Sequence, residues 1–574
     1  MPPWTSANDL RPRRSVLPDA APTATTIAPQ PAEAPPPTSE VPEAAPRWAA
    51  SHLDSSTTIA EQPRSAAVSL DATEKENPHI VGPATAGDSH FLEDYLSSIQ
   101  EGGHGRAIRP ILPGVTSTPV MFMRVRKRPV GLAVDLNPSS AELQTIVKLL
   151  EPWQDAVLNL YFSRGNGCFP VLDEGYFREY VSRSRVSPAV VACLYAHAMC
   201  YWSSDPNLSR HHRPDARFIW NLALEALYSE LHISPGMPSI IAILLNIGGR
   251  PTTTMVGNGM LLGCAISLAH SLGLNRNPIA WNITEGEKTF RMQIWWCLVI
   301  HDRWTSLTYG TPPHIRQSHH DVPIPKANQH DERAQVFEAL ASLTIVLGAY
   351  IEQLYAAGDV TDRDPALAFS LDIWTDTLFG ELRRIIVRGM NLDTPGAANL
   401  RLCYLAARFF MCRVELSTEV DDYIPGQSPN DRLLKTRRMA EDIVHFVREL
   451  TAKQLGDFWL PTAAFVFSST TTFLVRLAVQ AELPTCETSM QSLSLSLAHD
   501  LVTSLRSHKD LYGWELGDIC IAQYGDVVDK LWSQNPASHL DPAWLDSAPF
   551  IPDPGFFESV IVDQWDPLAW CQAP

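Results

Sequence analysis

Two His-Asp dipeptides are the strongest candidates for a reactive or metal-binding site in this sequence. His301-Asp302 and His320-Asp321 each place an imidazole next to a carboxylate, and both groups are ligands for divalent metal ions. With His270 they could be completed into the ligand set of a helical metal-dependent hydrolase. Neutral histidines in a helical core are more often only hydrogen-bonded, so this hydrolase is the alternative interpretation rather than the main one.

Other catalytic signatures are missing from the sequence. It contains no P-loop, no G-x-G-x-x-G after a strand and no G-x-S-x-G, the motifs that bind nucleotide phosphates or carry a nucleophilic serine. Asp421-Asp422 lacks the third carboxylate that helical prenyl-diphosphate enzymes require. The sequence therefore predicts no enzyme, no catalytic residue and no cofactor.

The ten cysteines begin at Cys168, are scattered, and include no C-x2-C pair. Most stand in apolar runs, which is typical of buried free thiols in a reducing compartment. We therefore assign no metal ligand in this chain.

The first His-Asp pair lies in the second of two predicted helices. Apolar residues at helical spacing predict the first helix over residues 260–272, ended by Gly273 in a left-handed conformation. Thr284 and Glu287 form a capping-box pattern that opens the second helix. This helix should run over residues 285–309 and end at Gly310, where two prolines follow.

The second helix is rich in tryptophan and carries a buried charge. Trp295, Trp296 and Trp304 mark it as a core element, because each indole buries a large apolar area. A carboxylate on the same helix face needs a polar partner. We hypothesise that Asp302 and Arg303 pin the following loop, residues 311–315, to the helix, with Arg291, Arg303, Arg316 or the loop amides as partners of the carboxylate.

These residues belong to an ordered series of motifs. They are AxxLAHSLGLNR at residues 265–276, Trp-Trp at 295–296, Asp-Arg-Trp at 302–304 and DVPIP at 321–325. The series resembles the regulatory domain of fungal zinc-cluster transcription factors, also called the xylanolytic-activator domain or middle homology region. The resemblance implies a structural and regulatory core made of Trp295, Trp296, Asp302, Arg303, Trp304, Gly310 and Asp321.

The resemblance also implies a function. It predicts a nuclear regulator of RNA polymerase II transcription that responds to metabolic, nitrogen or carbon signals. Partners would be other transcription factors, through homo- or heterodimers, and a small-molecule inducer whose lining candidates are Trp295, Trp296, Trp304 and His314. A purely inhibitory partner of zinc-cluster factors is a further interpretation.

The sequence departs from the family in one respect. The family's zinc binuclear cluster needs six cysteines at close spacing, because two zinc ions share thiolates, and this pattern does not occur here. Zinc and DNA contacts are therefore carried over to no residue. We expect DNA to be reached indirectly, or through an N-terminal module encoded by an upstream exon, to which any zinc would belong.

The net charge and the length of the apolar runs limit the kinds of partner that the chain is expected to bind. The chain has 45 Lys and Arg against 63 Asp and Glu, a net charge of −18, so it would be repelled by nucleic-acid phosphates without a local basic patch. Its longest apolar runs, such as residues 240–245, are far shorter than the ~20 residues that span a bilayer. No membrane partner is expected.

The expected fold is all-α, a large helical array between disordered N- and C-terminal segments, since no run alternates as strands do. Residues 1–87 hold 15 of the 46 prolines and should be disordered.

Residues 88–139 should form a short helix over residues 88–99, followed by a basic linker. The linker contains a candidate nuclear-import signal made of Arg124, Arg126, Lys127 and Arg128. Residues 140–345 form the regulatory domain and residues 346–535 its helical continuation. Residues 536–574 form an acidic-aromatic tail, a candidate activation segment through Phe556, Phe557, Trp565 and Trp570.

Overall fold

The computed structural model describes residues 75–82, 109–111, 120–128, 139–249, 255–281, 283–328, 330–355, 369–378, 380–417, 429–479 and 488–534. All of them belong to one contact unit of the chain, Gln62–Pro574. The predicted helix over residues 88–99 and the acidic-aromatic tail lie outside the described residues, as does the Pro-rich segment before residue 75.

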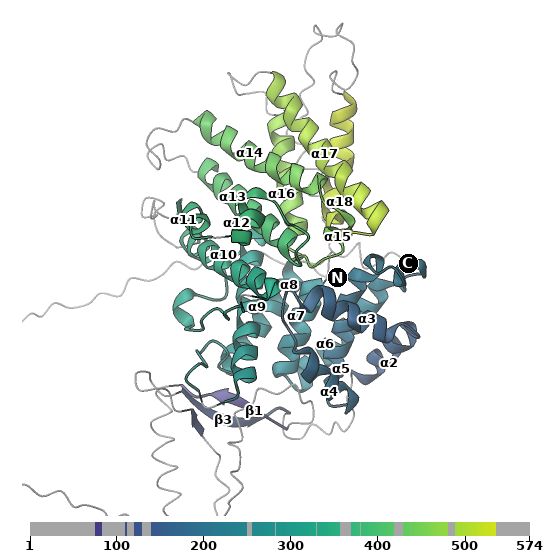
Figure 1. The fold of residues 1–574 in the computed structure, drawn as a ribbon, viewed down its shortest axis with the longest axis vertical. Coiled ribbons are helices and arrows are strands. Elements are labelled where there is room, and N and C mark those ends of the chain that lie inside the picture. Colours follow the sequence, from purple (N-terminus) through teal and green to yellow (C-terminus); the bar gives the residue numbers. More distant parts are fainter. Residues whose placement is uncertain are drawn as a thin grey trace, which may run out of the picture. The chain divides into compact units, whose positions relative to one another are not determined.

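The all-α prediction is confirmed, because helices dominate the described residues (Figure 1). The first group is α2 (Ser140–Leu149), α3 (Gln154–Tyr161), α4 (Glu174–Ser182), α5 (Pro188–Ala198), α6 (Ala216–Ile233), α7 (Met237–Gly249), α8 (Met255–Ser271), α9 (Glu285–Tyr309) and α10 (Glu332–Leu354). The second is α11 (Ser370–Asp376), α12 (Gly380–Arg383), α13 (Ala397–Ser417), α14 (Pro429–Arg448), α15 (Ala452–Leu455), α16 (Ala463–Val479), α17 (Thr488–Tyr512) and α18 (Asp518–Gln534).

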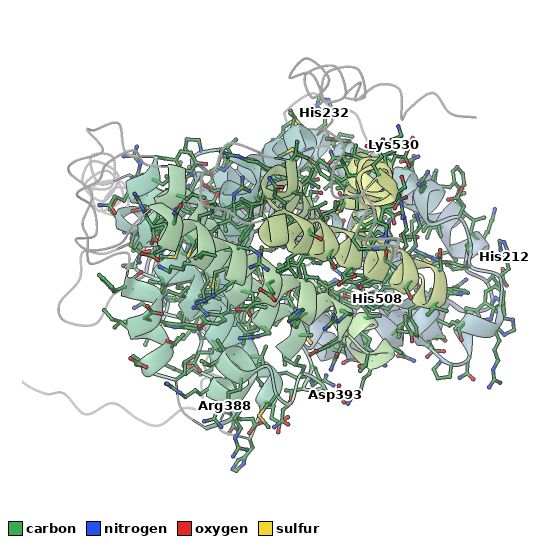
Figure 2. All side chains as sticks on the ribbon, turned by 90° about the horizontal axis from the view of Figure 1, so that it is seen from above. His212, His232, Arg388, Asp393, His508 and Lys530 are labelled. Atoms are coloured by element: carbon green, nitrogen blue, oxygen red, sulfur yellow. The ribbon has the colours of Figure 1, made fainter. Side chains whose placement is uncertain are left out.

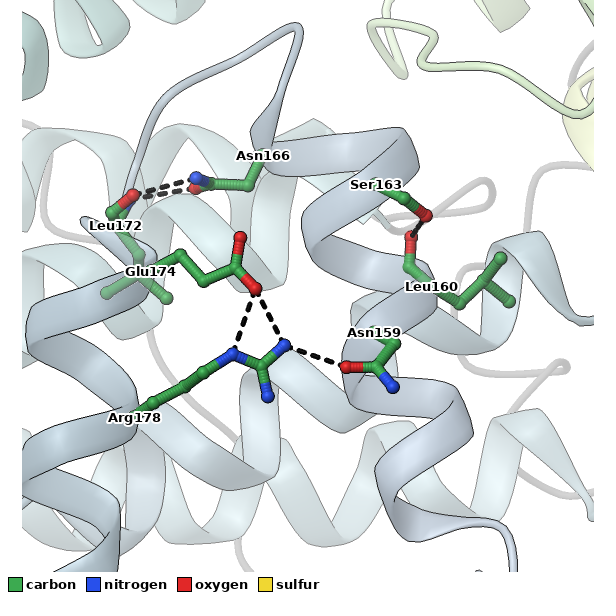
Figure 3. A network of polar contacts seen from close by, with 7 residues as sticks. All are labelled: Asn159, Leu160, Ser163, Asn166, Leu172, Glu174 and Arg178. Carbon is green, nitrogen blue, oxygen red and sulfur yellow. Dashed lines mark hydrogen bonds and ion pairs between the residues drawn. The ribbon is translucent and has the colours of Figure 1, made fainter.

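Local sequence explains where several of these helices begin. The side chain of Asp173 accepts a hydrogen bond from the Tyr176 N–H at 2.8 Å and so caps α4, as Ser187 caps α5 and Asp331 caps α10. Such caps satisfy backbone donors that have no partner within the helix. On α4, Arg178 then bonds both Glu174 in its own helix and Asn159 of α3, which fixes the two helices together (Figure 3).

The core is continuous through both groups of helices. Every residue of α7 is buried, as expected for a helix that is apolar on all sides, and α7 packs on α5, α6 and α8. In the second group α16 packs on α17 and α18. The buried His508 of α17, which is labelled in Figure 2, lies 2.8 Å from the Val447 carbonyl of α14. The two groups meet where Phe169 stacks on Phe458 with their ring centres 5.2 Å apart.

The structure corrects the prediction of a basic linker. Val120–Arg126 is a strand, β3, and it pairs antiparallel with β1 (Glu76–Ile80) and β2 (Arg109–Ile111) in the order β1-β3-β2. Part of the segment predicted to be disordered is therefore also a strand. The basic residues of this segment made its strand pattern difficult to recognise in the sequence. Pairing between strands some forty residues apart also produces no local sequence pattern.

This small sheet contacts the helical body at several points, among them an aromatic pair and a hydrogen bond from the Asn77 side chain of β1 to the Pro235 carbonyl at 2.7 Å. The buried Phe122 of β3 lies edge-on to Trp281, with ring centres 5.7 Å apart. Trp281 lies in the turn between α8 and α9. The sheet thus covers the turn between α8 and α9, which contains the end of the motif at residues 265–276.

One described helix corrects the expectation about apolar runs. By length and composition α10 could cross a membrane, but 56% of its most apolar window is buried inside the structure. Trp304 of α9 packs there, donating its indole N–H to Thr344 of α10 at 3.1 Å. This contact is that of a core helix.

Candidate functional site

The α8–α9 pair forms as its sequence predicts, except that α8 begins at Met255 rather than at residue 260. Thr284 caps α9 by accepting a hydrogen bond from the Glu287 N–H at 3.2 Å. Gly273 and Gly310 both have positive φ, +63° and +71°, the left-handed conformation that glycine adopts without a steric cost. These local signals fix the length of α9, and therefore the point at which the following loop, Thr311–Pro325, leaves it.

Asp302 holds the start of this loop. Only 1% of Asp302 is exposed, and its carboxylate accepts hydrogen bonds from the backbone N–H groups of His314 and Ile315, both at 2.9 Å. It also contacts the His314 ring at 3.0 Å. This hydrogen bond raises the pKa of the half-exposed His314, against the opposing effect of burial. The contact that we hypothesised for Asp302 is thus present.

Arg303 holds the same loop, but through a residue that the sequence did not indicate. Its guanidinium pairs with Glu352 of α10 at 2.6 Å, and the same Glu352 oxygen accepts a hydrogen bond from the Gln317 N–H at 2.9 Å. Arg303 is 2% exposed, whereas Glu352 is 34% exposed, so only the arginine side of this pair is shielded from water. Glu352 lies 49 residues from Arg303, which is why no spacing rule could have found it.

The end of the loop is tied to the α8–α9 turn. Asp321 accepts a hydrogen bond from the Asn277 N–H at 2.8 Å, and the Asn275 side chain donates to the His319 carbonyl at 2.8 Å. Trp296 of α9 donates its indole N–H to the Pro323 carbonyl at 2.9 Å. The loop is therefore fixed by side chains of α9, α10 and the turn, and we call this arrangement the clamped loop.

Arg291, which the sequence offered as a partner of Asp302, instead joins the sheet to this site. Arg291 of α9 is buried and donates to the carbonyls of Leu272 and Gly273 at 2.9 and 3.2 Å, at the end of α8. Its guanidinium lies 4.8 Å from the centre of the Trp281 ring and 5.9 Å from that of Phe122, within the range of cation–π attraction. Burial lowers the pKa of Arg291 to about 10, so it stays charged at neutral pH.

The two His-Asp pairs do not form a metal centre. His301 lies against Phe169, with ring centres 5.1 Å apart, and burial lowers its pKa to about 3. Asp302 and Asp321 already accept hydrogen bonds from loop and turn amides. Among the residues that the structure describes, no three His, Cys, Asp or Glu side chains are placed to hold a metal ion, so the hydrolase alternative has no ligand set there.

The described cysteines do not fit a zinc cluster either. All eight are free thiols, most of them are buried, and they lie in separate elements from Cys168 to Cys520. A binuclear cluster would need six thiolates within one small module. No step of the function is therefore assigned to zinc bound by these residues.

The part of the chain that carries the clamped loop matches a known class of domain. Residues 158–350 match the family model of the fungal specific transcription factor domain, which runs from α3 into α10 and includes the whole clamped loop. The resemblance read from the sequence is thus confirmed for this part of the chain.

Individual relatives are fungal transcriptional regulators. The chain is 25% identical over 416 residues to an uncharacterized transcriptional regulatory protein of Schizosaccharomyces pombe, covering 70% of this chain and 62% of the relative. It is 22% identical over 382 residues to the transcriptional activator protein DAL81 of Saccharomyces cerevisiae, covering 55% and 38%. A shorter similarity, 36% over 63 residues, links it to cutinase transcription factor 1 beta of Fusarium vanettenii. The chain spans less than two thirds of the first two relatives.

Proposed function

We propose that this protein is a regulator of RNA polymerase II transcription that acts in the nucleus through its helical domain. The observation that carries the proposal is the match of residues 158–350 to the fungal specific transcription factor domain. The relatives are named as transcriptional regulators and activators, a class distinct from enzymes. A response to metabolic, nitrogen or carbon signals is part of the proposal.

The clamped loop supports a regulatory use of this domain. Its two ends are tied to different elements, Asp302 on α9 and the turn that carries Asn277, while Arg303 connects it to α10 through Glu352. A loop held by a few polar contacts can be either attached to the helices or released from them. A ligand or partner that binds one of these two states better shifts the loop toward that state. Partners would be other transcription factors, through homo- or heterodimers, and DNA indirectly or through an N-terminal module.

The nuclear-import proposal has to take the sheet into account. Arg126 and Arg128 are exposed, whereas Lys127 is 8% exposed, and Arg124 lies in β3 opposite Pro78. An import receptor could read the whole run only if β3 left the sheet. We therefore expect import through these residues to be weaker than that of the same peptide fused to a reporter protein.

A reporter assay tests the proposed function. The full chain and a version without residues 536–574 are fused to a heterologous DNA-binding domain and expressed at equal levels in a fungal host. The full chain should activate the reporter and the shortened chain should not, because the acidic-aromatic tail would supply activation. Silence of both fusions, combined with repression of a co-expressed zinc-cluster activator, would favour the inhibitory partner. Silence without such repression would refute the proposal.

A further inference from the structure

The inner side of the clamped loop meets a cluster of polar atoms that lack hydrogen-bond partners. The cluster comprises His270 Nε2 on α8, Trp295 Nε1 and Arg303 Nη1 on α9, and both ring nitrogens of His320 on the loop. Buried polar groups are nearly always hydrogen-bonded, and leaving one without a partner costs about 1–3 kcal/mol. Several such atoms in one place point to a missing ligand or to water.

These side chains are neighbours. The ring centre of Trp295 lies 5.5 Å from that of His270 and 5.5 Å from that of His320. The charge of Arg303 and the ring of His270 both act on the titration of His320. Trp295 is fully buried and Arg303 is 2% exposed, so bulk water does not reach the unpartnered donors on α9.

The chemistry of the cluster favours an acceptor. An indole N–H and a guanidinium nitrogen can only donate, and a neutral imidazole donates from one of its two nitrogens. Burial is the main cause that lowers the pKa of both His270 and His320, so both are neutral at pH 7. Arg303 gives only Nη2 to Glu352 and leaves Nη1 unused. Among these four side chains donors therefore outnumber acceptors. The charge of Arg303 is partly balanced by Glu352, and the carboxylates of Asp321 and Glu352 also act on the titration of His320.

We propose that this cluster is a binding site for a small carboxylate or another oxyanion, held by Trp295, Arg303, His270 and His320. Trp295 and Arg303 would donate to its oxygens from α9, while His320 would donate from the loop and His270 from α8. An anion there joins the loop to both helices, so binding tightens the clamped loop. The consequence for transcription rests on the proposed function, whereas the site itself does not.

Binding is measured on the purified full chain by thermal unfolding and isothermal titration calorimetry. The probes are sodium sulfate, sodium acetate and sodium succinate, each compared with sodium chloride at matched ionic strength. At least one oxyanion should raise the unfolding temperature above the chloride value and give a saturable heat of binding. Equal effects of all four salts would overturn the proposal and assign the cluster to bound water only.

Two variants locate the site. Trp295→Phe removes one donor, and His320→Ala removes the donor on the loop; each should weaken binding about tenfold, the effect of losing one hydrogen bond to a charged group. Trp202→Phe is the matched control, because Trp202 is also buried with an unpartnered indole N–H but lies in the segment that follows α5. Unchanged binding in both site variants, or an equal loss in the control, would place the anion elsewhere and refute the site.

The binding result and the reporter result are independent. A chain that binds an oxyanion at this cluster but never alters transcription would refute the regulatory function and leave the site standing. A chain that activates transcription but binds none of the oxyanions would do the reverse.

Discussion

Replacing Asp302 by alanine should release the start of the clamped loop. The carboxylate accepts two backbone hydrogen bonds, from His314 and Ile315 at 2.9 Å, and it contacts the His314 ring. No other residue of α9 contacts these two N–H groups among the hydrogen bonds of the described residues. Asp302→Ala therefore leaves both donors to water or to no partner.

The size of the effect follows from these contacts. A hydrogen bond to a charged group contributes about 1.5–3 kcal/mol. The lower value applies to both backbone bonds because the loop can move and rehydrate, which gives a loss of about 3 kcal/mol. The His314 ring adds little, since it is nearly half exposed and exposed pairs contribute roughly 0–1 kcal/mol. At about 2 °C per kcal/mol for a domain of this size, the unfolding temperature should fall by roughly 6 °C.

Urea unfolding of the wild-type and variant chains measures this loss, and trypsin measures the loop directly. Arg316 lies in the clamped loop and is exposed, so release of the loop should speed cleavage after it. The matched control is Asp393→Ala, because Asp393 pairs with Lys453 at 3.6 Å and both side chains are more than half exposed. The control should change the free energy of unfolding by less than about 1 kcal/mol and should leave trypsin cleavage of the loop unchanged.

The reasoning would be refuted by an Asp302→Ala chain that keeps wild-type stability and wild-type cleavage at Arg316. Stability loss equal to that of Asp393→Ala would have the same meaning. Asp302→Asn separates charge from geometry: one amide oxygen can still accept from the loop, so the loss should be intermediate. A loss as large as that of alanine would show that both carboxylate oxygens are required.

Two further perturbations test the helical body and its contact with the sheet. Burial lowers the pKa of His197 to about 4 and that of His301 to about 3, from 6.5; their contribution to stability should be complete above pH 6.5 and should be lost as the pH falls toward 4, by about 1.4 kcal/mol per pKa unit. Urea unfolding at a series of pH values checks this, and constant stability from pH 7 to pH 4.5 would contradict it. Gly273→Ala should cost about 2 kcal/mol by the same measurement, since its φ is +63° and its Cβ would lie 2.8 Å from Phe122. Gly259→Ala, a helical position with nothing within 4 Å, should instead be neutral or stabilising.

Local features of this protein can be predicted from its sequence. The Thr284 cap and the glycine at position 310 give the bounds of α9, and the apolar spacing of residues 260–272 gives the end of α8 to within one residue, because caps and left-handed glycines act within one helical turn. The start of α8 at Met255 was not predicted. The burial of the α9 tryptophans could also be predicted from the sequence, because large apolar rings at helical spacing belong to a core. The Asp302 contact could be anticipated because its partners lie only 12 and 13 residues away.

The contacts between distant segments could not be predicted from the sequence and follow from the packing of the folded chain. Glu352 as the partner of Arg303, Phe122 as the partner of Trp281 and the pairing of β1 with β3 depend on how helices and strands pack, and no local residue pattern encodes such a partner. The cluster beneath the clamped loop has the same origin. His270 and His320 were first considered as metal ligands because of their sequence neighbours, but the fold sets them around Trp295 and Arg303, where the surplus of donors suits an anion. Sequence spacing indicates which residues could act together, whereas the packing of the folded chain determines which polar atoms are left without a partner.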